Sequence, residues 1–371
     1  MNIKDRIQAE ALEAWLVTKR GTVVLPTGVG KTRLGRLAAD ALMEEGLSKI
    51  AVVTSKLAIL DGWKDELGGR DAELLIINSA SKSNIEVDLL IVDEVHKALS
   101  PKFSQVFSSI KYKHLLCLTA SLPKEQEKLD ILFKYAPLVM EKKVSDVEEA
   151  MSPFRVINKQ VEMSKTTKAR YNYFNTAFNE ASVNIAKLKR AEYGSKAIFD
   201  VARERSKMND DSPLTAWCKK YWAYMSLRKQ ILYNNPSKID AVKMLCEKHK
   251  GQNIIIFTKT IALAELIGST IGAYVYHSKL STSEREFILS NFGKVLVTVD
   301  AMNEGVNLVD MEVGISASGV STQIEQIQRL GRINRIKDNK FATFYNLYVK
   351  DSPEQRWVTE KTKDLKVEWE S

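Results

Sequence analysis

The sequence has few cysteines and no long apolar segment, and these absences exclude several classes of protein. Its 371 residues include 3 cysteines, which stand far apart and form no Cys-x-x-Cys pair. We therefore expect reduced thiols, a cytoplasmic location and no zinc site. No apolar run approaches the roughly 20 residues that cross a bilayer, so we expect no membrane partner. Residues 1–10 are polar and lack the apolar region of a signal peptide, which argues against secretion.

The composition is that of a folded protein with a mild basic excess. Hydrophobic residues make up 44% of the chain and charged residues 27%, which excludes a largely disordered chain. The length suggests two or three domains of about 100–200 residues each. The net charge is +9, and residues 164–235 hold most of it, with 14 Lys and Arg against 6 Asp and Glu.

The basic stretch 164–235 also contains 11 aromatic residues, and the combination allows two interpretations. Basic side chains neutralise phosphates and aromatic rings stack on unpaired bases, which suits contact with a single strand of nucleic acid. The aromatic residues also recur every three or four positions, as at Tyr171, Phe174 and Phe178. That spacing is typical of a helix face packed in a core. We favour the second interpretation, with the basic side chains on a solvated outer face.

Short apolar runs alternate with helix-length segments on both sides of this stretch, a pattern that predicts parallel sheets in an α/β protein. The expected strands are residues 22–25, 50–54, 74–77, 89–92, 115–118, 254–257, 273–276, 295–299, 313–316 and 341–345. Pro153 and Pro236 bracket the helical stretch and are natural boundaries. We therefore predict an α/β domain at 1–152, a basic helical insertion at 153–235 and a second α/β domain at 236–371.

Residues 25–32, Leu-Pro-Thr-Gly-Val-Gly-Lys-Thr, follow one predicted strand and open a predicted helix. In this context the glycines let backbone N–H groups converge on a phosphate, Lys31 reaches the terminal phosphate oxygens, and the Thr32 hydroxyl ligates Mg²⁺. The strict P-loop pattern has a small residue where this chain has Leu25. The residues that we assign to the nucleotide phosphates are Pro26, Thr27, Gly28, Val29, Gly30, Lys31 and Thr32.

The predicted strand 89–92 runs into the DExH-type sequence Asp93-Glu94-Val95-His96. A carboxylate at the end of a strand beside a phosphate loop can hold Mg²⁺, and the next acid can activate water. We assign Asp93 to the metal and Glu94 to the attacking water. A strand, phosphate loop and helix followed by a second strand that ends in an acid predict a nucleoside triphosphatase that uses Mg²⁺.

With these motifs the chain resembles the superfamily 2 helicases and translocases over nearly its whole length. Residues 328–335, Gln-Arg-Leu-Gly-Arg-Ile-Asn-Arg, fit motif VI of that family at every defined position. The resemblance implies two tandem RecA-like domains with ATP in the cleft between them. It assigns Gln328, Arg332 and Arg335 to the γ-phosphate, where a guanidinium stabilises developing charge. The DExH box makes the chain look closest to compact DNA branch-migration and repair helicases of the phage UvsW type.

The resemblance also implies roles for residues in the lesser motifs. Arg6 and Gln8 resemble the adenine-reading Q element, and Gly305 lies in a segment like motif V. Residues in and near a segment like motif III are implied to couple the two domains: His96, Thr119 and Ser121. Residues in segments like motifs Ia, IV and V are implied to contact the nucleic-acid strand: Thr54, Ser55, Trp63, Thr258, Lys259 and Thr298.

We therefore predict an ATP-dependent DNA helicase that translocates on single-stranded or branched DNA and unwinds or branch-migrates it. Contacts to phosphates imply little sequence preference. Three alternatives stay open: a double-stranded DNA translocase that does not separate strands, as the motor subunit of a larger complex; an RNA helicase; and a non-catalytic ATP-gated clamp. The complete catalytic set argues against the clamp. Because both arginines come from the same chain, we expect a monomer, alone or within a larger complex.

Overall fold

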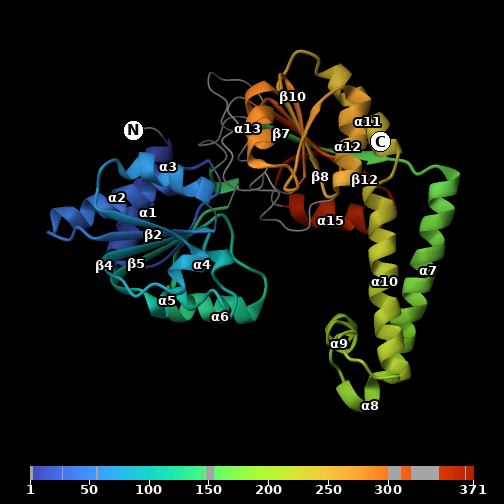
Figure 1. The fold of residues 1–371 in the computed structure, drawn as a ribbon, viewed down its shortest axis with the longest axis horizontal. Helices are drawn as coiled ribbons and strands as arrows, with labels where there is room; N and C mark the ends of the chain where they lie inside the picture. Colours follow the sequence, from blue (N-terminus) through green and yellow to red (C-terminus); the bar gives the residue numbers. More distant parts are fainter. Residues whose placement is uncertain are drawn as a thin grey trace.

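Two parallel β-sheets, each with helices packed against it, organise the chain (Figure 1). The computed structural model describes residues 3–26, 28–55, 57–143, 145–147, 154–299, 311–318, 342–363 and 365–371. Every strand pair in both sheets is parallel. The predicted α/β class with two parallel sheets is therefore confirmed.

The first sheet is built from the N-terminal part of the chain. Its strands are β1 (Arg20–Val24), β2 (Ile50–Thr54), β3 (Ala72–Ile76), β4 (Glu86–Asp93), β5 (Lys111–Thr119) and β6 (Leu138–Glu141). They lie in the order β3-β2-β4-β5-β1-β6. The helices are α1 (Ile3–Leu16), α2 (Lys31–Glu44), α3 (Leu57–Leu67), α4 (Ile77–Ala80), α5 (Val106–Ser109) and α6 (Gln126–Tyr135).

Helices cover both faces of the first sheet, with α1 to α3 on one side and α4 to α6 on the other (Figure 1). Successive side chains of a strand point to opposite faces. In β4, Leu89 and Ile91 pack in the core beneath α1 to α3, whereas Leu90 and Val92 pack in the opposite core. A strand buried on both faces must be apolar at every position, which explains the continuous apolar runs.

The second sheet has seven strands in the order β13-β7-β12-β11-β8-β10-β9. Their bounds are β7 (Phe154–Val161), β8 (Ile254–Thr258), β9 (Tyr274–Tyr276), β10 (Val295–Val299), β11 (Val313–Ser316), β12 (Ala342–Val349) and β13 (Val367–Glu370). The flanking helices are α11 (Ser237–Lys248), α12 (Ile261–Ile271), α13 (Thr282–Asn291) and α15 (Pro353–Thr362).

The start of the predicted insertion differs from the expectation. Its first residues form β7, which pairs with β12 from Phe154–Ala342 to Val161–Val349 and so belongs to the second sheet. The sequence of β7 carries Arg155, Asn158 and Lys159, so it lacks the continuous apolar run on which strand prediction depended. The helical part of the insertion therefore begins after β7.

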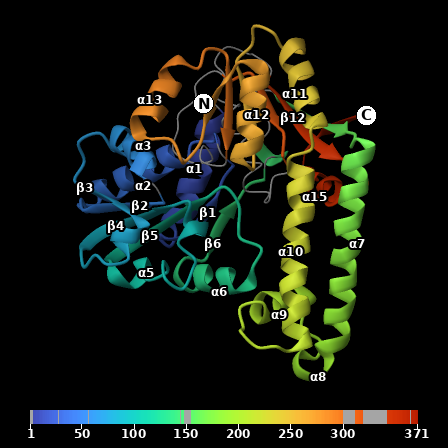
Figure 2. The same cartoon turned by 45° about the vertical axis from the view of Figure 1, so that its right-hand side comes forward.

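Two long helices, α7 (Lys165–Leu188) and α10 (Pro213–Tyr233), run side by side away from the second sheet (Figures 1 and 2). Two short helices at their far end, α8 (Arg190–Tyr193) and α9 (Ile198–Arg205), complete what we call the helical hairpin. Its own core buries Ile185, Val201 and Tyr221, with Phe178 partly buried against them. The aromatic residues therefore serve mainly as core, as favoured from their spacing. No helix among the described residues is long and apolar enough to span a membrane.

Candidate active site

The predicted nucleotide-site residues follow three neighbouring strands, β4, β5 and β1. Because these strands are parallel, their carboxyl ends meet at one edge of the sheet, where ligands bind in open α/β sheets. The backbone N–H of Leu25 donates to the carbonyl of Thr119 at 3.0 Å, which ties the start of the phosphate loop to the end of β5. The structure thus brings the phosphate loop, the 93–96 segment and the 119–121 segment together.

The phosphate loop turns at two glycines. Gly28 has φ of 92° and Gly30 has φ of 98°, a region that residues with a Cβ rarely adopt. Gly30 immediately precedes α2, so the unpaired N–H groups of the first turn of that helix face the loop. This is the backbone arrangement that binds a phosphate. Thr27 lies outside the described residues.

Helix α1 contacts the loop through Gln8. The buried Gln8 amide donates from Nε2 to the carbonyl of Val29 at 2.7 Å, and a Cβ on Gly30 would lie 2.1 Å from the same nitrogen. The side chain of Arg6 is 64% exposed and pairs with Glu10 at 3.8 Å. Of the two residues predicted to read adenine, the structure therefore places only Gln8 against the loop.

Lys31 and Glu94 form an ion pair across the site. The distance between Lys31 Nζ and Glu94 Oε1 is 3.6 Å, and Lys31 Nζ also donates to the carbonyl of Leu25 at 3.3 Å. Glu94 has φ of 50°, which is uncommon for a residue other than glycine and is often found at functional sites. The lysine is therefore held at the loop beside the acid proposed to activate water.

The Asp93 carboxylate is almost fully buried, and each of its oxygens accepts one hydrogen bond. Oδ1 accepts from the backbone N–H of Glu94 at 2.9 Å, and Oδ2 accepts from the indole Nε1 of Trp63 at 2.9 Å. Burial and the neighbouring Glu94 carboxylate raise the pKa of Asp93 to about 6, and Lys31 and Trp63 oppose the rise. Two acids near one ammonium leave an excess of negative charge, and oxygen ligands suit Mg²⁺. The residues present therefore fit a divalent cation.

Trp63 was predicted to contact a nucleic-acid backbone, and this prediction is wrong. The side chain is completely buried in the core of the first sheet. The sequence contained a signal for this burial, because the apolar residues Leu60, Trp63 and Leu67 recur at helical spacing. All three are buried. The sequence contained no comparable signal for the contact between Trp63 and Asp93, because the two residues are 30 positions apart.

The three residues predicted to couple the domains lie next to one another. His96 Nδ1 is 3.1 Å from Thr119 Oγ1, and that hydroxyl donates to the carbonyl of Ser121 at 2.9 Å. His96 Nδ1 also lies 3.4 Å from Glu94 Oε2. A continuous polar chain therefore leads from Glu94 to the segment that follows β5.

The residues predicted to contact the nucleic-acid strand are divided by burial. Thr54, Thr258 and Thr298 are buried, and the Thr258 hydroxyl donates to the carbonyl of Thr298 at 3.3 Å. Their side chains lie at strand ends facing the interior, so the predicted side-chain contact is not possible in this arrangement. Ser55 and Lys259 are only partly buried and remain candidates. Gly305, Gln328, Arg332 and Arg335 lie outside the described residues.

Two family models match the chain, one in each half. Residues 4–77 match the type III restriction enzyme res subunit, and residues 237–337 match the helicase conserved C-terminal domain. A DNA 3'-5' translocase XPB2 of Sulfurisphaera tokodaii is 28% identical, over 95% of this chain and 84% of that protein. A DNA 3'-5' helicase XPB of Mycobacterium tuberculosis is 24% identical, over 96% of this chain and 63% of that protein.

Eukaryotic relatives are longer. The chain covers 43% of the general transcription and DNA repair factor IIH helicase/translocase subunit XPB of Schizosaccharomyces pombe, at 23% identity over 92% of this chain. Closeness to the phage UvsW type stays a prediction.

Solved structures have the same fold over the full chain. The Hef helicase domain of Pyrococcus furiosus matches with a TM-score of 0.60 at 16% identity, over 97% of this chain and 98% of that one. Dbp5 of Saccharomyces cerevisiae, bound to RNA and ADP BeF3, matches with a TM-score of 0.61 at 14% identity, over 98% of this chain and 88% of that one. The two sheets are therefore the two RecA-like domains of such proteins. Both family matches, in this order, and the relatives support a superfamily 2 helicase or translocase.

Proposed function

We propose that the protein hydrolyses ATP at the phosphate loop of the first domain and uses the energy to translocate on DNA and to unwind or branch-migrate it. The observation that carries the proposal is the convergence of Lys31, Asp93 and Glu94 at one sheet edge. The names of the relatives support DNA as the track and a 3'-5' direction.

The site residues divide the chemistry among them. Loop N–H groups and Lys31 would bind the triphosphate, so the ammonium would exchange its contact with Glu94 for one with a phosphate. Asp93 and the Thr32 hydroxyl would hold Mg²⁺, which neutralises charge on the phosphate oxygens. The Glu94 carboxylate, no longer paired with Lys31, would accept the proton of the attacking water. Gln328, Arg332 and Arg335 are proposed to contact the γ-phosphate from the second domain.

The chain of contacts from Glu94 through His96 and Thr119 to Ser121 supports a coupling role for these residues. A shift of the segment after β5 would move the Thr119 hydroxyl and with it the imidazole beside Glu94. Domain closure and water activation would thereby be linked.

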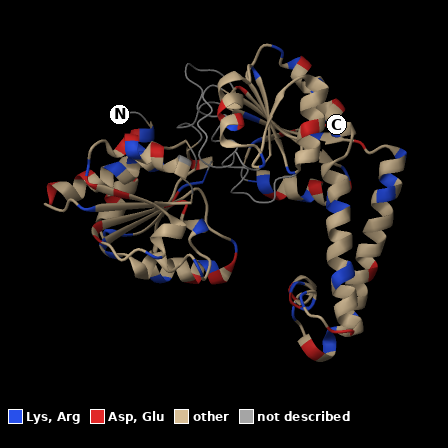
Figure 3. Cartoon of the chain, in the orientation of Figure 1, with Lys and Arg blue, Asp and Glu red and all other residues tan. Residues whose placement is uncertain are grey.

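The helical hairpin is proposed to contact the phosphates of DNA. Basic side chains occur along both long helices and at the far end of the hairpin (Figure 3). Among those that are exposed, and for which the described residues supply no acidic partner, are Lys168, Lys187, Arg190 and Lys219. Side chains of this kind can neutralise phosphates without breaking existing ion pairs.

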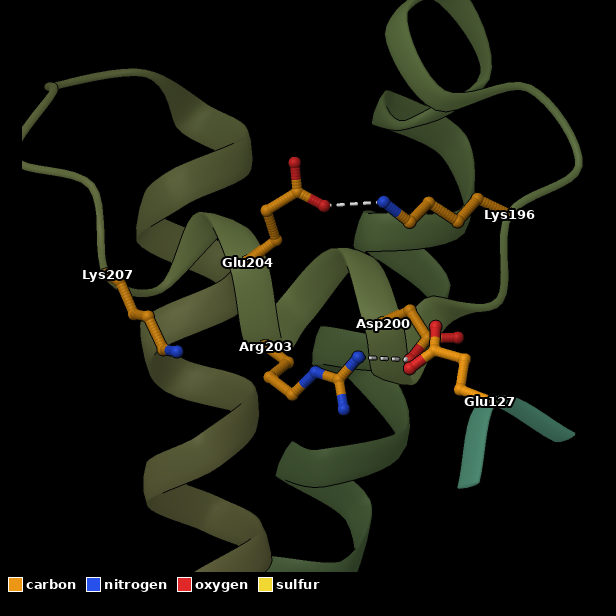
Figure 4. A pocket seen from close by; sticks show the side chains of 6 residues that line it. All are labelled: Glu127, Lys196, Asp200, Arg203, Glu204 and Lys207. Carbon is orange, nitrogen blue, oxygen red and sulfur yellow. Dashed lines mark hydrogen bonds and ion pairs between the residues drawn. The ribbon is translucent and has the colours of Figure 1, made fainter. Parts of the chain in front are cut away.

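The far end of the hairpin also faces α6 of the first domain across an open cavity of about 520 Å³. Its lining residues are Glu127, Lys196, Asp200, Arg203, Glu204 and Lys207 (Figure 4). Most of these charges are already compensated, because Lys196 pairs with Glu204 and Arg203 pairs with Asp200. The mixed lining gives no preference for an anion, so we place the DNA contact on the four exposed residues instead.

Alanine at these four positions is expected to weaken DNA binding and its salt dependence together. Each lost phosphate contact should reduce the slope of log affinity against log salt by about 0.7–0.9. Fluorescence anisotropy with labelled DNA at several salt concentrations measures this slope. The matched control removes four exposed lysines elsewhere, Lys111, Lys124, Lys243 and Lys350. An equal loss of affinity in both variants would mean that only the net charge of the protein matters, and it would contradict a DNA contact at the hairpin.

ATP hydrolysis at fixed salt, with different nucleic acids, tests the proposed function as a whole. We expect strong stimulation by single-stranded DNA or a four-way junction over the rate without nucleic acid. Stimulation by duplex DNA alone would favour the translocase alternative, and stimulation by RNA alone would overturn DNA as the track. Absence of hydrolysis under every condition would contradict the proposal and favour an ATP-gated clamp.

A further inference from the structure

Trp63 makes a contact in the candidate site that its predicted role in a segment like motif Ia does not explain. Its side chain is fully buried on α3, yet its single polar group is directed at a carboxylate, with 2.9 Å between Nε1 and Asp93 Oδ2. An indole ring has one donor and no acceptor. The orientation of the whole ring is therefore tied to Asp93.

A glycine on α2 makes this position of the ring possible. A Cβ on Gly35 would lie 2.3 Å from Cη2 and 2.7 Å from Cζ3 of Trp63, too close for any real contact. Glycine inside a helix costs roughly 0.5–1 kcal/mol relative to alanine. The ring thus lies against the bare backbone of the helix that begins at the phosphate loop, and it reaches the strand that ends in Asp93.

The hydrogen bond fixes a group that otherwise turns easily. Rotation about the last bond of an aspartate side chain has broad minima. In Asp93 both oxygens are already held, one by the backbone N–H of Glu94 and one by Trp63. Each carboxylate oxygen can accept more than one bond, so both keep capacity for a metal or for its water. Loss of the indole N–H would leave Oδ2 without this donor and free the carboxylate to rotate.

We propose that Trp63 is a positioning residue that orients the Asp93 carboxylate for Mg²⁺. The inference rests on the proposed function, in which Asp93 is a metal ligand. Partners that orient a metal ligand typically contribute about 10–100-fold to metal affinity. The residue would act through Asp93 and would touch neither the nucleotide nor the metal.

The test compares Trp63→Phe with a matched variant. Phenylalanine keeps an aromatic ring and removes the N–H. Trp15 is the control, because it is fully buried in the same core and donates its indole N–H to the carbonyl of Leu115 at 3.0 Å, outside the candidate site. Binding of a fluorescent ADP analogue is measured in EDTA and across a Mg²⁺ titration, together with thermal unfolding.

We expect Trp63→Phe to bind the analogue normally in EDTA but to need about 10-fold or more Mg²⁺ for half of the metal-dependent tightening. Trp15→Phe should lower the unfolding temperature without this shift. An unchanged Mg²⁺ dependence in Trp63→Phe would overturn the inference. If Trp63→Phe has no effect, Asp93→Asn distinguishes a failure of the inference from a failure of the proposed function. An unchanged Mg²⁺ dependence in Asp93→Asn as well would contradict Asp93 as a metal ligand. Loss of the Mg²⁺ dependence in Asp93→Asn would contradict only the role of Trp63.

A second pair of variants tests the inference if Trp63→Phe folds poorly. Gly35→Ala pushes the ring away from α2 and should also raise the Mg²⁺ requirement. Gly62→Ala is its control, because Gly62 lies inside α3 next to Trp63 and its Cβ would meet nothing within 4 Å. Equal Mg²⁺ dependence in the two alanine variants would contradict the positioning role.

Discussion

Replacement of Glu94 by glutamine is expected to lower the rate of ATP hydrolysis by roughly 10²–10⁴-fold, the contribution of a positioned general base. Glutamine has nearly the same shape but cannot accept the proton of the attacking water. The structure adds that Glu94 pairs with Lys31 at 3.6 Å. Loss of this charge frees the lysine for phosphate, so ATP binding should persist or tighten. Steady-state hydrolysis with DNA and equilibrium binding of an ATP analogue measure the two effects.

The control for this prediction lies on β4, the strand that precedes Glu94. Glu86 begins β4 and is exposed, whereas Glu94 follows its last residue. Glu86→Gln should therefore keep the parent rate of hydrolysis. A Glu94→Gln variant that hydrolyses ATP at the parent rate would contradict the assigned role. A variant that loses ATP binding together with hydrolysis would indicate a structural effect instead.

The parts of the fold predicted from sequence are those where one physical requirement dominates. Strand segments buried on both faces, such as β2 and residues 89–92 of β4, are apolar at nearly every position, and their positions were predicted. β7 and β13 were missed because they carry charged or polar residues between apolar ones. β6 was missed because it has only three apolar residues, all at least partly exposed. In β13 even Trp369 is half exposed. Partly exposed strands lack a continuous apolar run, so composition alone does not reveal them.

In the candidate site, too, the sequence predicted some features and not others. Parallel topology alone brings the loop after β1 and the acid at the end of β4 to one edge, and motif spacing was enough to predict both. The direction of individual side chains depends on packing between distant segments. Trp63 was expected to face a strand of nucleic acid and instead contacts Asp93, because Gly35 leaves room for its ring. The inward direction of the buried Thr54, Thr258 and Thr298 side chains likewise depends on packing and was not predicted from the motifs.

The second large effect is expected at a buried ion pair in the second domain. Lys238 on α11 and Glu354 on α15 are both fully buried, and 2.6 Å separates Nζ from Oε1. Burial lowers the pKa of Lys238, and the Glu354 carboxylate opposes this shift. Glu354 Oε2 also accepts the backbone N–H of Val349 at 3.2 Å. The pair therefore joins two helices to the end of a central strand.

Lys238→Met should destabilise the protein by roughly 3–5 kcal/mol, because it leaves a carboxylate buried without its cation. Chemical denaturation at neutral pH, followed by a signal from the second domain, measures the loss. The double variant Lys238→Met with Glu354→Gln removes the uncompensated negative charge and keeps an acceptor for the backbone N–H of Val349. It should therefore be clearly more stable than the single variant. Arg356→Met is the matched control on α15, where an exposed pair with Glu360 spans 3.9 Å and should contribute less than about 1 kcal/mol. Equal destabilisation in the single and double variants would mean that lost packing, and not the uncompensated charge, is the cause.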